Sequence, residues 1–421
     1  MTQLRLVDLK NHETVHSMTP CSPSTLIEGN RFLGTASLSH ELVPNPKRPL
    51  RALFVITSMP VGGAETLLVN LLRKFRPSHI VPSVACLKDK GPLGQEIAKE
   101  FDVTEHWLKS KYDWRVLPRL ARHIRKGKFD ALISVGAGDK MFWGRLAARL
   151  ASLPVVCSAL HSTGWPDGVG KMNRWLTPIT DAFIAVAKPH GQFLIDFEKF
   201  PANKVVVIPN GIDTTRFRPH QESKADVRRE LGLEPETQIV GIVAALRPEK
   251  NHILFVNAAS RVIAKFPKAH FVIIGDGPER ANIESAIAAL KLEKNVSLLG
   301  TRSDTPRLLA AMDVFALTSH NEASPVSILE ALSCGVPVVS TRVGSVAESV
   351  HDQWNGFTVE PEDVEAITER IKHLLWNKET AELMGNNGRE HVQSHGSLNT
   401  MVQMYEHLIH SIFDRKTNRV Q

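Results

Sequence analysis

Strand-like and helix-like segments alternate along most of the chain, and this alternation constrains the fold more than any other feature. A buried-strand pattern, RALFVIT, starts at residue 51 and leads through a glycine turn into the amphipathic stretch VGGAETLLVNLLRKF. The same succession continues to VVVIPNG and restarts at TQIVGIVAAL, residues 237–246. Such alternation is typical of parallel sheets covered by helices on both faces. We therefore predict an α/β fold of two Rossmann-like, doubly wound domains that face a central cleft.

The length of the chain also favours two domains, since 421 residues are more than one hydrophobic core usually serves. The pattern predicts one domain over residues 49–212 and a second over residues 213–395. Residues 396–421 contain a further amphipathic stretch, which we expect to form a helix that packs back on the first domain. Residues 1–48 show no sustained period and run into the linker-like VPNPKRP, so we interpret them as an N-terminal extension without a predicted fold.

The composition predicts a soluble, cytoplasmic protein. Its four cysteines are far apart in the sequence and match neither a disulfide framework nor a zinc site. No apolar run reaches the roughly 18 to 20 residues that a membrane-spanning helix needs. The first residues, MTQLRLVDLKNHETVHS, lack the apolar core of a signal peptide.

The net charge of +7 is unevenly distributed. Residues 51–212 hold 23 Lys and Arg against 13 Asp and Glu, whereas residues 213–421 hold 23 against 27. A basic first half favours an anionic partner, either a membrane surface or a substrate that carries phosphate. A solvated basic face without a partner would have the same composition. A nucleic-acid partner is not expected, since no RNA- or DNA-binding motif accompanies the pI near 9.2.

Basic residues are densest in RVLPRLARHIRKGK, residues 115–128, where cations surround an apolar stripe of Val116, Leu120 and Ile124. A basic amphipathic helix of this kind can lie on an anionic bilayer. It can equally pack on the sheet through its apolar stripe and keep its charges in water, and the two arrangements are compatible. Three nearby aromatic residues favour the interfacial interpretation: Trp107, Tyr112 and Trp114.

Two carboxylates frame a strand–loop–helix segment, NEASPVSILEALSCGVPVVS, residues 321–340. Glu322 lies in a loop of small residues after a predicted strand, and Glu330 follows eight residues later inside the next predicted helix. The backbone between Ala323 and Val326 could offer N–H groups to an anion at the start of that helix. Glu330 could accept hydrogen bonds from two vicinal hydroxyls, such as those of a ribose.

Other residues at predicted strand ends could also face an anion. Gly62 and Gly63 separate the first strand from its helix, and Gly275 ends the strand FVIIG, although tight turns without a ligand explain these glycines as well. Arg247 and Lys250 follow the first strand of the second domain and could hold a pyrophosphate, although ordinary solvated charges would give the same sequence. The chain has no G-x-x-x-x-G-K-[ST] motif, so a Walker-type NTPase is not expected.

Five motifs in order make the chain resemble the family 4 retaining glycosyltransferases of the GT-B fold, over about residues 50–410. The E-x7-E signature of that family matches Glu322 and Glu330, and its GGAE turn matches Gly62 to Glu65. VIPNGIDTTRF resembles the interdomain segment of the family, and FVIIGDGPER resembles its glycine–proline turn. SALHSTG resembles the segment that carries a histidine at a strand end, here His161.

The resemblance implies a role for each matching residue. Glu330 would hold the ribose of a nucleotide-sugar, Glu322 would face the hydroxyls of its sugar, and His161 would contact that sugar near the reacting centre. Lys250 would stabilise the diphosphate leaving group. The rest of the implied donor site comprises Gly62, Gly63, Arg247, Gly275, Gly300, Thr301, Arg302, Ala323, Ser324, Pro325 and Val326, with Gly300 to Arg302 near the base. No cofactor and no metal ion is expected, because the family uses cations and backbone amides instead.

One position departs from the family pattern. The family commonly has an arginine five residues before the lysine, and this chain has Ala245 there. Arg247 lies two residues further on and could reach the same phosphate.

The resemblance thus implies a metal-independent, retaining hexosyltransferase with a nucleotide-sugar donor, UDP before GDP. Front-face transfer, in which the acceptor attacks as the nucleotide diphosphate leaves, is the simplest route to retention. We expect a glycan or lipid-linked acceptor on the basic first domain, in the synthesis of cell-surface polysaccharide or lipopolysaccharide, and peripheral contact with an anionic membrane. Two alternatives stay open: a nucleotide-sugar 2-epimerase of the same architecture, and a non-catalytic nucleotide-sugar-binding protein, which Ala245 makes conceivable.

Overall fold

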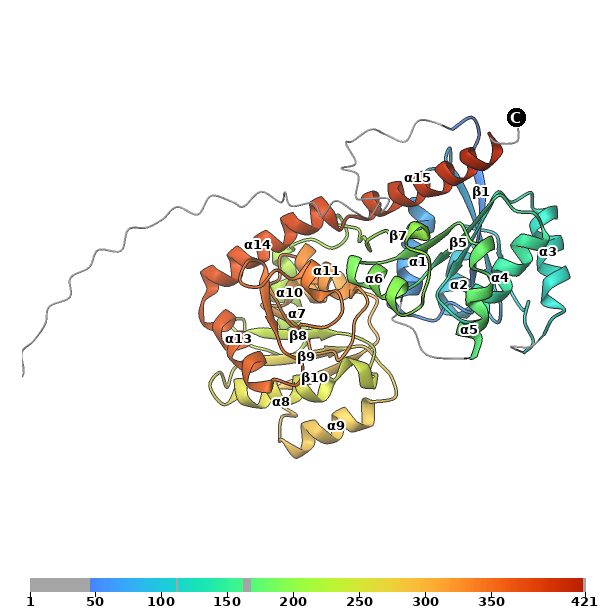
Figure 1. The fold of residues 1–421 in the computed structure, drawn as a ribbon. Helices are drawn as coiled ribbons and strands as arrows, with labels where there is room; N and C mark the ends of the chain where they lie inside the picture. The colour runs from blue at the N-terminus through green and yellow to red at the C-terminus, as the bar shows by residue number, and fades with distance from the viewer. Residues whose placement is uncertain (1–45, 111–112, 162–167, 419–421) are drawn as a thin grey trace, which may run out of the picture.

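The computed structural model describes residues 46–110, 113–161 and 168–418, which form two lobes, each around one parallel sheet (Figure 1). The sheet of the first lobe has seven strands in the order β3-β2-β1-β4-β5-β6-β7. These strands are β1 (Leu50–Ile56), β2 (Ile80–Cys86), β3 (Val103–Thr104), β4 (Ala131–Val135), β5 (Val155–Ala159), β6 (Ala182–Ala185) and β7 (Val205–Val207). The helices are α1 (Gly63–Lys74), α2 (Gly91–Ile97), α3 (Val116–Lys126), α4 (Asp139–Leu150), α5 (Gly168–Trp175) and α6 (Lys188–Asp196), with the short 3-10 helices η1 (Thr177–Ile179) and η2 (Ala202–Lys204).

The sheet of the second lobe has six strands in the order β10-β9-β8-β11-β12-β13. These strands are β8 (Ile239–Val243), β9 (His270–Ile274), β10 (Val296–Gly300), β11 (Val314–Leu317), β12 (Val338–Thr341) and β13 (Gly356–Val359). Its helices are α7 (Gln221–Glu230), η3 (Pro248–Lys250), α8 (His252–Ile263), α9 (Arg280–Ala289), α10 (Thr305–Ala311), α11 (Val326–Ser333), α12 (Val346–Ser349), α13 (Val364–Trp376) and α14 (Lys378–His395). The last helix, α15 (Leu398–Thr417), returns to the first lobe. The predicted pair of doubly wound, Rossmann-like sheets is confirmed.

The six strands of the second sheet have the same order as β1 to β6 in the first sheet, and each sheet reverses its strand order once. The reversal falls between β1 and β4 in the first sheet and between β8 and β11 in the second. Loops on the two sides of such a reversal leave in opposite directions, so the carboxyl ends of these strands are the usual ligand-binding place in an open parallel sheet. The two lobes therefore each offer one such place.

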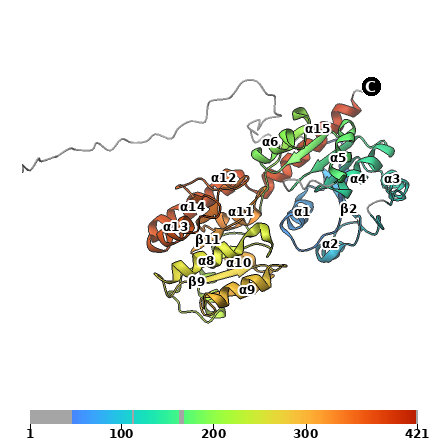
Figure 2. The ribbon, with the colours of Figure 1, turned by 60° about the horizontal axis from the view of Figure 1, so that its bottom comes forward.

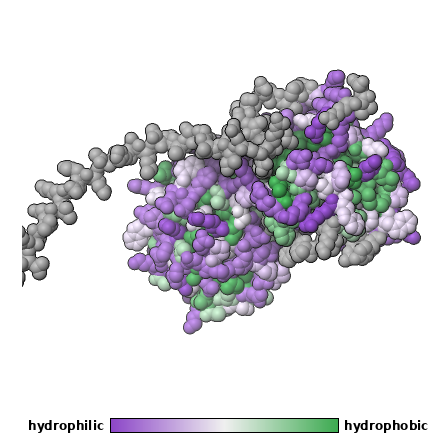
Figure 3. Space-filling view, viewed as in Figure 1, coloured by the Kyte–Doolittle hydropathy of each residue, from purple (hydrophilic) through white to green (hydrophobic). Residues whose placement is uncertain are grey.

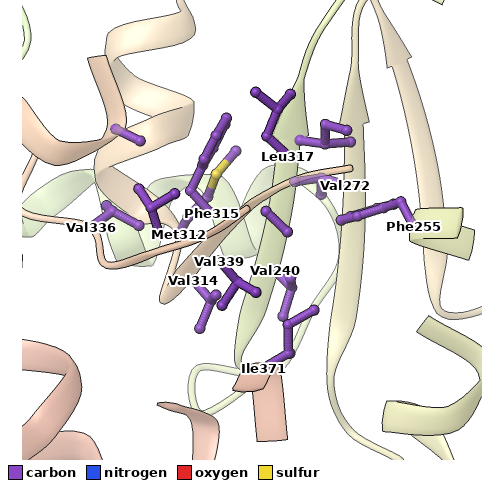
Figure 4. Packing of buried hydrophobic residues seen from close by; sticks show 14 of the residues in the cluster. Val240, Phe255, Val272, Met312, Val314, Phe315, Leu317, Val336, Val339 and Ile371 are labelled. Carbon is purple, nitrogen blue, oxygen red and sulfur yellow. The ribbon is translucent and has the colours of Figure 1, made fainter. Parts of the chain in front are cut away.

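The central strands are apolar because helices cover both faces of each sheet. All five residues of β4 and all five of β9 are buried. Figure 4 shows the core of the second lobe, where Met312 and Phe315 lie close together among valines of neighbouring strands. A side chain at Gly241 in β8 would collide with Met312, so this glycine leaves the room that the methionine fills.

Two crossings of the chain between the lobes lie side by side. Ile212 forms an isolated bridge with Ser397, and the N–H of Leu398 donates to the carbonyl of Ile212 at 2.8 Å. Ile212 packs in the core of the second lobe, and Leu398 packs in the core of the first.

Helix α15 lies along the first lobe (Figures 1 and 2) and contributes to its core with Met401, Tyr405 and Ile409. The carboxylate of Glu406 is completely buried and accepts hydrogen bonds from Arg76, through the backbone N–H at 3.0 Å and Nε at 2.8 Å. α15 is thus a structural part of the first lobe. Among the described helices, none combines the length and the hydropathy that crossing a bilayer requires.

Candidate active site

The strand reversal of the second sheet brings a lysine and a glutamate together. Lys250 ends η3, which follows β8, and Glu322 lies in the loop after β11. Nζ of Lys250 lies 2.6 Å from Oε1 of Glu322, and the hydroxyl of Ser319 donates to the same oxygen at 2.7 Å. Glu322 is only 7% exposed, so these two donors stabilise a carboxylate that is almost completely removed from water.

The loop from Glu322 to Pro325 is fixed by contacts with both lobes. Ser345 donates its N–H to the carbonyl of Glu322 at 3.3 Å and its hydroxyl to the carbonyl of Ala323. Gly344 has a φ of +52°, and a side chain there would collide with the carbonyl of Glu322, so this position requires glycine. From the first lobe, Nδ2 of Asn210 donates to the carbonyl of Ser324 at 3.1 Å.

Helix α11 begins directly after this loop, as predicted. Its N-cap is Pro325, which has no side-chain acceptor to satisfy the first N–H groups of the helix. The N–H groups of Val326 and Ser327 form no hydrogen bond with the described part of the chain. They are therefore available to an anion.

Glu330 lies just over one turn into α11. Its carboxyl group forms no hydrogen bond or ion pair with the residues that the structure describes. Burial raises the pKa of Glu330 to about 8, and the charge of Arg216 acts in the opposite direction. Glu330 is half-buried and has no protein partner in the described structure, so a ligand can reach its carboxyl group and satisfy it.

Arg247 begins the turn that leads to Lys250. Its side chain is 62% exposed, and Nη1 lies 3.9 Å from Oε1 of Glu249, which is a long ion pair. It forms no ion pair with Glu322 in the described structure, so the guanidinium is not part of the Lys250–Glu322 contact. Ala245 precedes it and contributes no charge.

The predicted glycines of the second lobe pack backbone against backbone. Gly275 has a φ of +142°, a side chain there would overlap the carbonyl of Ala244, and its N–H donates to the carbonyl of Gly300 at 2.9 Å. The hydrogen bond joins the ends of β9 and β10, and the close approach to Ala244 at the end of β8 explains the need for glycine without a ligand. Thr301 is exposed, whereas the guanidinium of Arg302 is bound to Asp304 at 2.8 Å and to Glu230 at 3.0 Å.

In the first lobe, the predicted residues gather at the carboxyl ends of β1 and β5. Gly62 is the N-cap of α1, and a side chain on Gly63 would meet no atom within 4 Å, so this turn has open space beside it. Burial lowers the pKa of His161 to about 4, and the charges of His190 and Lys140 act in the same direction. The imidazole is therefore neutral at neutral pH. A cavity of about 10 Å³ borders it, with room for about one water molecule.

Sequence reasoning missed the residues that hold the loop from Glu322 to Pro325. Ser319, Gly344 and Ser345 act on this loop from the ends of β11 and β12, and the only signal for them is that small polar residues follow apolar strands. Asn210 lies in VIPNGIDTTRF, which the sequence identified as an interdomain segment without giving the amide a role.

The apolar stripe of the basic segment faces the core. Val116, Leu120 and Ile124 in α3 are buried against the first sheet. Arg119 and Arg125 bond to backbone carbonyls. In this segment, the exposed cations that form no side-chain hydrogen bond or ion pair in the described structure are Arg115, Arg122, Lys126 and Lys128. Trp114 is 67% exposed beside them, and Tyr112 lies outside the described residues. In the face seen in Figure 3, hydrophobic and hydrophilic residues are mixed over both lobes.

Comparison with known proteins identifies the family. A model of the glycosyl transferases group 1 matches residues 223–391, and a model of glycosyltransferase family 4 matches residues 61–216. A GDP-mannose-dependent monoacylated alpha-(1-6)-phosphatidylinositol monomannoside mannosyltransferase of Corynebacterium glutamicum is 30% identical over 383 residues, which cover 86% of this chain and 98% of that protein. The chain belongs to the family 4 glycosyltransferases.

Two further comparisons agree. The UDP-Gal:alpha-D-GlcNAc-diphosphoundecaprenol alpha-1,3-galactosyltransferase of Escherichia coli is 29% identical over 292 residues, which cover 66% of this glycosyltransferase and 75% of the relative. The crystal structure of Anabaena HepE in complex with UDP-glucose has a TM-score of 0.76 and 22% identity, over 86% of this chain and 100% of that one. The GT-B fold and the glycosyltransferase activity are thus confirmed. Within the described ranges, no three His, Cys, Asp or Glu side chains are grouped to hold a metal ion.

Proposed function

We propose that this glycosyltransferase moves a hexose from a UDP-sugar to a lipid-linked acceptor, with retention and without a metal ion. The observation that carries the proposal is the arrangement around one loop. Glu322 and Lys250 form a buried pair at the strand reversal, unused N–H groups begin α11, and the carboxyl group of Glu330 has no partner in the described structure. These three features match, in this order, the groups that would bind the sugar, the diphosphate and the ribose of a nucleotide-sugar.

For the ribose, Glu330 is the proposed acceptor of two hydroxyl hydrogen bonds. Hydroxyl donors stabilise the ionised form of a carboxyl group, so donor binding should lower its raised pKa. A proton is then released when the donor binds at neutral pH. The burial that raises this pKa also strengthens the new hydrogen bonds.

For the diphosphate, Lys250 and the N–H groups of Val326 and Ser327 are the proposed ligands. Glu322 pairs with Lys250, so an incoming phosphate would compete for the ammonium while the sugar hydroxyls donate to Glu322. Arg247 is the proposed second cation in place of the arginine that Ala245 lacks. Its exposed, weakly paired guanidinium can turn without breaking a strong contact.

For the reaction, the enzyme would position the acceptor hydroxyl on the face from which the nucleotide diphosphate leaves. Positive charge and oriented N–H groups stabilise the leaving group as its charge develops, and the leaving oxygen takes the acceptor proton. His161, neutral at neutral pH, would contact the transferred sugar as a hydrogen-bonding group and not as a cation.

For the acceptor, the first lobe is the proposed binding surface. The names of both relatives describe acceptors with a lipid part, and the net charge of residues 51–212 is strongly positive. The exposed cations of α3, together with Trp114, would contact anionic headgroups at the cytoplasmic face of a membrane. This placement fits the synthesis of a cell-surface polysaccharide or lipopolysaccharide.

A thermal-shift series with UDP-, GDP-, ADP- and dTDP-sugars tests the donor. We expect one nucleotide class, UDP first, to raise the melting temperature of the wild-type enzyme, and Glu330→Ala to lose that increase. Glu382→Ala, on the exposed side of α14 in the same lobe, is the matched control and should keep it. Stabilisation that survives in Glu330→Ala would contradict the ribose role, and stabilisation by no donor would contradict the proposed site.

A further inference from the structure

A cation, Lys140, lies at the strand reversal of the first sheet and is not part of the proposed donor site. Lys140 lies in the first turn of α4, directly after β4, and Gly62 and Gly63 lie after β1 on the other side of the reversal. This place is the counterpart, in the first lobe, of the place that holds Lys250 and Glu322 in the second. Open parallel sheets bind ligands there.

The loop before α4 is built to hold the Lys140 side chain at this edge. Gly136 has a φ of +87°, and a side chain on it would lie 2.6 Å from Cε and 2.8 Å from Nζ of Lys140. The lysine therefore occupies the space that a Cβ would fill. The N–H of Gly136 donates to the carbonyl of Ala159 at 2.6 Å, which ties this loop to the end of β5, two residues before His161.

The ammonium group has no partner in the described residues, where it forms no hydrogen bond and no ion pair. Burial lowers the pKa of Lys140, whereas the charges of Glu65 and Asp139 act in the opposite direction. Neither carboxylate comes within ion-pair distance, and Glu65 turns back toward Gly62 at the start of its own helix. The Lys140 side chain is only partly buried, so its unpaired ammonium is accessible to a ligand that supplies an acceptor.

The groups near Lys140 indicate that the ligand of its ammonium group is an anion. His161 is close enough to be influenced by Lys140, and it is neutral at neutral pH, so it adds no negative charge. A lysine offers three donors on a point charge, which suits a phosphate oxygen. The donor diphosphate already has Lys250 and the start of α11 in the other lobe.

We propose that Lys140 binds a phosphate group carried by the acceptor and thereby places the acceptor sugar beside His161. This inference rests on the proposed function, because it gives that acceptor its chemical class: a glycosyl phosphate or glycosyl diphosphate. The phosphate could belong to a soluble sugar phosphate or to a lipid diphosphate, and both present the same group to Lys140.

Kinetics with acceptors that share one sugar test this assignment. Lys140→Met and Lys140→Arg are compared with the wild type and with Lys99→Met, an exposed lysine of the same lobe. The acceptors are a soluble glycosyl phosphate, a lipid glycosyl diphosphate in detergent, and an alkyl glycoside without phosphate. We expect Lys140→Met to raise KM about 10- to 100-fold for the phosphorylated acceptor that the wild type prefers, since one hydrogen bond to a charged group is lost. The alkyl glycoside should be unaffected, and Lys140→Arg should recover part of the loss.

Three results would overturn the proposal. An equal loss with the alkyl glycoside would give Lys140 a structural role, a fall in donor affinity would assign it to the donor, and an unchanged KM would remove it from binding. Preference for one phosphorylated acceptor identifies the source of the phosphate.

A binding measurement separates this proposal from the proposed function. With saturating UDP in the donor site, inorganic phosphate should raise the melting temperature of the wild type and of Lys99→Met, and not of Lys140→Met. This result supports the phosphate site even if no acceptor is turned over. Failure of every acceptor in the wild type, by contrast, contradicts the proposed function, and an equal phosphate effect in all three proteins contradicts the Lys140 site.

Discussion

The carboxylate of Glu348, in α12 of the second lobe, accepts a hydrogen bond from the backbone N–H of Lys188, the first residue of α6 in the first lobe. Both of its oxygens lie 3.2 Å from that nitrogen. A carboxylate at the start of a helix is stabilised by the helix dipole. This contact therefore links the two lobes by charge as well as by hydrogen bonding.

Replacing Glu348 by Ala should weaken the link between the lobes. We expect a larger radius of gyration in small-angle scattering without donor, and a rise of about 2- to 10-fold in donor KM, since one charge-assisted contact is removed. Glu379→Ala is the control, because Glu379 also lies in the first turn of a helix, α14, and that helix belongs to the second lobe. An unchanged radius of gyration in Glu348→Ala would show that the contact does not hold the lobes together.

Replacing Lys250 by Met should lower kcat by about 100-fold or more, because a donor to the leaving group is lost. Stability should fall by about 1–3 kcal/mol, since within the described residues the buried carboxylate of Glu322 keeps only Ser319 as a side-chain donor. Denaturant unfolding of Lys250→Met, Glu322→Gln and the double variant measures the coupling. The double variant should be more stable than Lys250→Met, and equal stabilities would mean that the pair is not coupled.

The raised pKa of Glu330 predicts how stability depends on pH. The folded enzyme holds a proton on Glu330 up to about pH 8, whereas the unfolded chain loses it near the ordinary value of 4.5. The unfolded chain therefore binds fewer protons between these values, so this group makes stability fall as pH rises from about 4.5 to 8.

Glu330→Gln should remove that dependence. At pH 8 its melting temperature should exceed that of the wild type by about 2–4 °C for each kcal/mol gained, and at pH 4.5 the two should agree. Donor affinity of the wild type should rise as pH increases toward 8, because the ionised form accepts the ribose hydroxyls. Parallel melting curves from pH 4.5 to 8 would contradict the assignment.

The lowered pKa of His161 predicts that this residue does not titrate in the neutral range. The pH–rate profile of the wild type should therefore contain no transition with a midpoint near pH 6.5 that depends on His161. His161→Gln should lower kcat about 10- to 100-fold with donor affinity unchanged, because the proposed role of the imidazole is to position the sugar for transfer. A pH–rate limb near 6.5 that the substitution abolishes would show that His161 acts as a charged group.

The alternation of strands and helices predicted most of the elements that position the site residues, because the sequence pattern of each strand or helix depends on neighbouring residues alone. Glu322 in a loop and Glu330 in α11 follow from the local succession of strand, loop and helix. The alternation did not predict α14, because this helix is largely polar and contains two internal glycines, so its hydrophobic period is weak.

The contacts that make the site depend on which strands are neighbours. Lys250 meets Glu322 because β8 pairs with β11, although β9 and β10 lie between them in the chain. The hydrogen bond from Asn210 to Ser324 depends on how the lobes meet. For a similar reason, the sequence could not predict whether the apolar stripe of α3 faces the core or a membrane. Only the packing on the sheet shows that Val116, Leu120 and Ile124 face the core. Local sequence patterns contain none of this information.

The position of α15 also sets the order in which the enzyme can fold during its synthesis. The ribosome makes the strands of the first lobe early, but Tyr405, Ile409 and the partner of Arg76, Glu406, emerge only after the whole second lobe. Until then the first lobe exposes the apolar surface that α15 will cover, whereas the second lobe already has all of its strands. The domain made first is therefore the domain completed last, and a ribosome that stalls before α15 leaves a nascent chain that chaperones must protect.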